Sequence, residues 1–217
     1  MTPSVAGELV RSGHLVRSLR LAPFVPAAVA VVGFLVARRD GTPDALGDLR
    51  VLGVLLALGS GYVLDDSAAG TLQAAPYGLA RRLWLRIGCA VAIVAPPWIV
   101  MIAYLLPSVP AGYRRDVGLG LTAELAATLA VVWAVAAWAR RRGIDQPGIV
   151  TTPALLASLL LATSISSAPM LVGPGPQWTA AQLRWSGVVA GATVVLLAGM
   201  RDPAARRILT GTLPGRR

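Results

Sequence analysis

The stretch VGLGLTAELAATLAVVWAVAAWARRR, residues 117–142, indicates the class of fold. It stays apolar for far longer than a β-strand needs, contains one acidic residue, Glu124, and ends in three consecutive arginines. A helix needs about 20 mainly apolar residues to cross the hydrocarbon core of a bilayer, and basic residues collect at the cytoplasmic ends of such helices. The stretch therefore predicts a transmembrane helix that ends at the inner surface.

Other apolar runs of the same kind lie on both sides of it, in a chain that is 55% hydrophobic and only 14% charged, with a mean hydropathy of +0.66. This composition predicts an all-α, polytopic membrane protein with six spans and no soluble domain. The predicted spans are 22–37, 49–64, 87–106, 117–139, 149–171 and 185–200. They form one membrane domain, 22–200, which follows an interfacial segment, 1–21, and precedes a basic tail, 201–217.

All 20 basic residues are arginines, and they cluster beside the apolar runs. The net charge of +10 therefore indicates contact with a membrane surface and its lipids, and not with nucleic acid. Most of the arginines fall on one side if both termini are cytoplasmic, which predicts that orientation in the cell membrane. The segment 4–21 has apolar residues at roughly helical spacing, which favours an amphipathic surface helix over a frayed basic tail.

The first cytoplasmic loop in this topology is LDDSAAGTLQAAPYGLARRLWLR, residues 64–86. Acidic residues at its start favour a short helix, and Pro76 and Gly78 predict a corner before an interfacial helix that leads into the third span. The simpler reading is a loop whose arginines only fix topology. However, about twenty residues exceed what a turn between two spans needs.

This loop resembles the first cytoplasmic loop of permease subunits of type-two ATP-binding-cassette (ABC) exporters. In that family it forms a coupling helix that docks on the nucleotide-binding subunit. The family also has six spans, an amphipathic helix before the first, and cytoplasmic termini, so the resemblance covers essentially the whole chain. The spacing from Gly70 to Pro76 is shorter than is usual in the family. The residues that match the family pattern are Asp65, Asp66, Gly70, Thr71, Leu72, Pro76, Arg81 and Arg82.

The resemblance implies no enzyme activity in this chain, no cofactor of its own and a separate ATPase subunit that binds ATP. The sequence agrees, because it has no lysine and no phosphate-binding G-x-x-x-x-G-K-[ST] loop. It also implies a second permease copy or a paralogue to enclose the pathway. The Gly- and Pro-rich loop before the last span resembles the region that caps the pathway in these exporters, although a plain flexible loop fits equally well. No residue selects a substrate.

Three residues within the spans are candidates for a pathway or a dimer seam. Glu124 is the one acidic residue well inside an apolar run, and a charge there costs at least about 2.5 kcal/mol unless it faces a cavity, a partner or interfacial water near Arg114 or Arg115. Ser164 and Ser166 could line a polar route, although membrane serines more often bond within or between helices.

Membrane enzymes fit the sequence poorly. The single histidine precedes the first span, and Asp65-Asp66 is the only acidic pair, which disfavours intramembrane proteases and aspartate-rich transferases. The stronger alternative is a non-transporting scaffold or accessory subunit of a membrane complex. It would share the composition and topology, but mutation of the 64–86 loop would not affect an associated ATPase.

Overall fold

A computed structural model describes residues 45–65, 79–144, 146–164 and 170–200, together with the helical positions Val25, Val29 and Gly33. These residues form helices and no strands. The long helices are α3 (Ala45–Val63), α4 (Leu79–Leu105), α5 (Arg114–Arg141), α6 (Pro147–Ser164) and α7 (Trp178–Met200). Two short 3₁₀ turns, η3 (Leu106–Ser108) and η4 (Ala111–Tyr113), connect α4 to α5.

Four of these helices are long and apolar enough to cross a membrane, namely α3, α4, α5 and α7. The described apolar part of α6 is shorter, and the first predicted span and both predicted terminal segments lie outside the described residues apart from the three isolated positions. The structure thus confirms that the described residues are all-helical and include four helices that could span a membrane. The number six stays a prediction.

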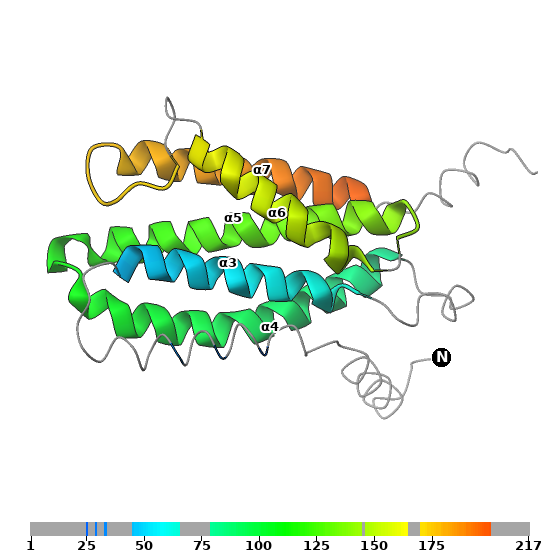
Figure 1. Cartoon of the computed structure of the whole chain (residues 1–217), viewed down its shortest axis with the longest axis horizontal. Helices are drawn as coiled ribbons and strands as arrows, with labels where there is room; N and C mark the ends of the chain where they lie inside the picture. The colour runs from blue at the N-terminus through cyan, green and yellow to red at the C-terminus, as the bar shows by residue number, and fades with distance from the viewer. Residues whose placement is uncertain are drawn as a thin grey trace, which may run out of the picture.

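The helices lie side by side and successive helices run in opposite directions (Figure 1), with α5 at the centre. It packs against α3, α6 and α7. In the 18-residue apolar stretch by which each helix could span a membrane, 61% is buried for α5, compared with 28% for α4 and 22% for α7. Alanines on α5 allow this close approach, because Ala127, Ala136 and Ala137 are fully buried. The predicted span 117–139 lies within α5, as its long apolar run requires.

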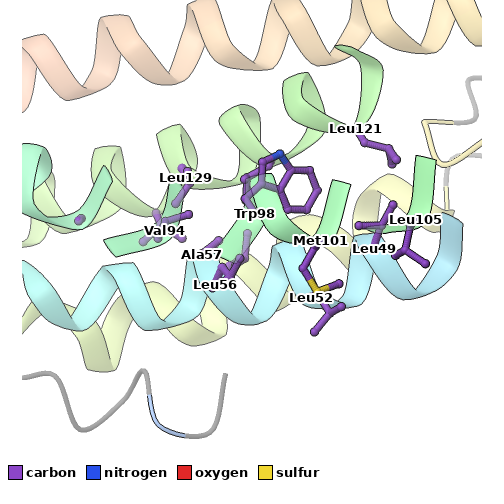
Figure 2. Packing of buried hydrophobic residues seen from close by; sticks show 14 of the residues in the cluster. Leu49, Leu52, Leu56, Ala57, Val94, Trp98, Met101, Leu105, Leu121 and Leu129 are labelled. Carbon is purple, nitrogen blue, oxygen red and sulfur yellow. The ribbon is translucent and has the colours of Figure 1, made fainter. Parts of the chain in front are cut away.

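A hydrophobic core fills the space between α3, α4 and α5 (Figure 2). Trp98 from α4 lies among leucines of α3 and α5, and its indole nitrogen donates to the hydroxyl of Thr122 (3.3 Å). The outward faces of α4 and α7 carry mainly apolar side chains. Ile99 and Val194 are examples, at 64% and 66% exposed. An apolar exterior of this kind is what a lipid environment requires.

The helix ends differ from the predicted ones where polar residues join a helix. α4 runs without a break from Leu79 through Arg86 and through Pro96-Pro97, so the segment after residue 78 is part of the third span's helix and not a separate interfacial helix. α7 begins at Trp178, before the predicted start at residue 185. A span predicted from apolar residues alone stops at such polar residues, whereas the backbone hydrogen bonds of the helix continue through them.

Candidate functional site

Glu124 has a partner, and it is Arg50 on α3. Arg50 Nε donates to Glu124 Oε2 (2.8 Å) and Nη2 donates to Oε1 (2.9 Å), so the guanidinium binds both oxygens. The side chains are 18% and 7% exposed. Two-point contact between a planar guanidinium and a carboxylate is among the strongest polar contacts in proteins, and it offsets the cost of placing either charge in an apolar bundle.

Two further groups complete what we call the Glu124 cluster, defined as Arg50, Glu124, Val172 and Gln182. Arg50 Nη2 also donates to the carbonyl oxygen of Val172 (2.6 Å), in the segment before α7. The Gln182 side-chain nitrogen, one turn into α7, donates to Glu124 Oε1 (3.3 Å). The cluster therefore joins α3, α5, α7 and the segment that precedes α7.

Of the surroundings expected for Glu124, the structure shows a charged partner. The Arg114 guanidinium donates instead to the carbonyl oxygens of Val109 (2.9 Å) and Pro107 (3.0 Å). Position 50 falls at the start of the predicted span 49–64, and the structure places Arg50 inside α3. An arginine can stay within a membrane helix when its charge is paired, and the ion pair supplies that condition.

A small cavity lies beside the cluster. Its volume is about 30 Å³, which is room for about one water molecule. Residues from α3, α4, α5, α6 and α7 line it, together with one from the segment before α7: Leu49, Arg50, Gly53, Val54, Trp98, Leu121, Glu124, Leu125, Thr128, Leu159, Leu171 and Trp185. The cavity is too small for a transported solute in this arrangement of one chain.

The opposite end of the bundle holds the start of the predicted coupling loop, and here Asp65 is buried. Its exposed fraction is 2%, and its Oδ1 accepts a hydrogen bond from the backbone N–H of Gly148 (2.8 Å). Gly148 follows Pro147 in the first turn of α6, where backbone N–H groups lack partners within the helix and favour a negative charge. Asp65 therefore caps α6. The sequence suggested capping of a helix within the loop itself.

Two arginines bind the backbone around Asp65. Arg86 on α4 donates to the carbonyl oxygens of Val63 (3.2 Å) and Asp65, and Arg140 on α5 donates to that of Leu64 (2.7 Å). These carbonyls belong to the last residue of α3 and the two residues after it, where the helix offers no partner. We call residues 63–65 with Arg86, Arg140 and Gly148 the Asp65 corner. It fixes the point at which the chain leaves the bundle.

The remaining predicted site residues are described only in part or not at all. Arg81 and Arg82 lie in the first turns of α4 and Ser164 is the last residue of α6, but their side chains are not described. The loop positions Asp66, Gly70, Thr71, Leu72 and Pro76, and also Ser166, lie outside the described residues. The structure brings Asp65 and Glu124 to opposite ends of the bundle, so they belong to two separate sites.

Sequence reasoning missed Arg50, Gln182, Arg86, Arg140 and Gly148 as contact residues. The sequence offered only one signal for Arg50 and Glu124, namely that both charges fall in the halves of their helices nearest the predicted outer side, and this signal does not pair them. Within the described parts of the chain, no group of three or more histidine, cysteine, aspartate or glutamate residues could hold a metal ion. Comparison with family models, curated proteins and solved structures gave no match.

Proposed function

We propose that this chain is the membrane-spanning subunit of an ABC exporter, working as a dimer and driven by a separate ATPase subunit. The main support is the resemblance of the 64–86 loop to a coupling helix, taken with the Asp65 corner from which that loop leaves the bundle. A loop that transmits motion from a partner subunit must be attached rigidly to the helix bundle. Hydrogen bonds from α4, α5 and α6 to residues 63–65 provide this attachment.

The proposal places the Asp65 corner on the cytoplasmic side and the Glu124 cluster toward the outside. The arginines at the end of α5 support this orientation, since Arg141 and Arg142 also stack near the ring of Trp138 (5.7 and 5.4 Å), a residue type that favours the membrane interface. A cavity of about 30 Å³ cannot pass a solute, so the pathway would form between two chains or after a rearrangement.

The test is to purify the tagged chain in mild detergent after crosslinking in membranes, and to measure ATP hydrolysis in the preparation. The loop variant Asp66→Ala/Thr71→Ala leaves the buried Asp65 intact, so it tests docking without disturbing the cap on α6. The matched control is Asp116→Ala, an exposed acidic residue in the first turn of α5 at the other end of the bundle.

We expect a copurifying ATPase with the wild-type chain and with Asp116→Ala, and its loss from the loop variant. A stable wild-type preparation that carries no ATPase after crosslinking would contradict the proposal, and the scaffold hypothesis would then be preferred. Equal recovery of ATPase with the loop variant would contradict the assignment of the 64–86 loop as the docking element.

A further inference from the structure

The Glu124 cluster connects parts of the chain that are distant in sequence through very few contacts. Arg50 and Glu124 are 74 positions apart, Glu124 and Gln182 are 58 apart, and Arg50 and Val172 are 122 apart. All of these bonds meet at one guanidinium and one carboxylate. If those two groups separate, the link between α3 and α5 is lost, and Arg50 loses the carboxylate that orients its guanidinium toward the carbonyl of Val172.

The segment before α7 contributes one side chain to the wall of the small cavity. Leu171 lines that cavity, and its neighbours on both sides are bonded to the bundle, Val172 through Arg50 and Met170 through the indole nitrogen of Trp185 (3.0 Å). Leu171 is itself 37% exposed, so one side of the segment faces outward. Leu171 therefore forms part of the cavity wall at this end, and the bonds of Met170 and Val172 hold it there.

We propose that the Arg50–Glu124 pair is a latch that holds residues 170–172 over the cavity and closes the bundle at the end where α3, α5 and α7 begin. A two-point ion pair is either formed or broken, which makes it suited to a two-state closure. Naming this closure the outer gate of an exporter rests on the proposed function. The existence of the latch rests on the contacts alone.

Arginine is required at position 50 because its guanidinium binds both Glu124 oxygens and the Val172 carbonyl at the same time. A lysine keeps the positive charge but presents one nitrogen, so it cannot reproduce this geometry. Arg50→Lys thus removes the latch while retaining the charge pair, and Glu124→Gln removes the charge of the carboxylate. The matched control is Arg114→Lys, since Arg114 lies at the same end and bonds only to nearby backbone carbonyls among its described contacts.

The experiment measures the reaction of one introduced cysteine with a small water-soluble methanethiosulfonate reagent in native membranes. The native Cys89 is first replaced by alanine, and Thr128→Cys then places the thiol in the wall of the cavity, where Thr128 is 6% exposed. Ala137→Cys, in the packed region at the opposite end, reports general loosening of the bundle.

With the latch intact, or with Arg114→Lys, we expect slow labelling at position 128. Arg50→Lys and Glu124→Gln should each raise that rate at least tenfold and leave position 137 protected. An unchanged rate at position 128 would overturn the latch, and so would an equal rise at positions 128 and 137, since the pair would then serve only to hold the fold. The assay needs no ATPase, so failure to capture an ATPase would count against the exporter and not against the latch.

Discussion

Replacing Asp65 by alanine should destabilise the bundle even when no partner protein is present. The substitution leaves the Gly148 N–H without its acceptor in a buried position, and an unsatisfied buried amide costs about 1–3 kcal/mol. This hydrogen bond is also the cap on α6, so the cost of losing the cap is already included in that figure. We expect a loss of about 2 kcal/mol, which for a chain of this length lowers the melting temperature by roughly 4–8 °C.

Asp65→Asn refines the test, because the amide oxygen can still accept the hydrogen bond while the negative charge at the start of α6 is lost. A charge at a helix terminus contributes about 0.3–1 kcal/mol, so the asparagine variant should fall between the wild-type chain and Asp65→Ala.

Thermal unfolding followed by tryptophan fluorescence in one detergent gives the comparison, with the exposed Asp116→Ala as the control. If Asp65→Ala melts no lower than Asp116→Ala, the Asp65 carboxylate does not stabilise the start of α6. A clear drop would mean that loss of a partner in any Asp65 variant reports on the fold as well as on docking.

Three further predictions concern glycines and topology. Gly148→Ala should cost about 1–3 kcal/mol in a thermal melt, because the added Cβ would lie 2.6 Å from the Tyr62 ring, whereas Gly112→Ala meets open space and should cost far less. Gly143→Ala should cost about 1 kcal/mol, since Gly143 has φ +83° and ends α5 in a left-handed turn; a melt equal to that of Gly112→Ala would refute this. In a chain without native cysteine, Gly112→Cys should react with an impermeant maleimide in intact cells and Arg142→Cys only after permeabilisation, and the reverse pattern would invert the topology.

The length of the apolar runs predicted the helices well, because helix formation in such a run depends on residues that are close together in the sequence. The run 117–139 lies inside α5 and the run 87–106 largely inside α4, since an unbroken apolar stretch has few alternatives to a helix in a bilayer. The ends were predicted less well. α7 extends back to Trp178 and so includes Gln182, a polar residue that ends an apolar run but bonds to Glu124 inside the bundle.

The two polar sites could be predicted only in part, because their contacts are long-range. The sequence indicates that Glu124 needs compensation but not that Arg50 supplies it. It indicates that Asp65 suits a helix start, yet the backbone N–H that Asp65 caps, that of Gly148, is 83 positions away. Arg86 and Arg140 carry the ordinary signal of basic residues at a membrane surface, and nothing in that signal reveals the carbonyls that they bind.

The Asp65 corner has a consequence for biosynthesis. The carbonyl of Leu64 is bound by a guanidinium 76 positions later, so this end of α3 cannot reach its final state until α5 has been synthesised and inserted. Until then, water must satisfy the carbonyl of Leu64, because Arg86 on α4 binds only those of Val63 and Asp65, and this would hold the end of α3 at the aqueous boundary. A nascent chain that stalls before α5 is complete would therefore present an unfinished helix end, a feature by which quality-control proteases could distinguish it from the finished protein.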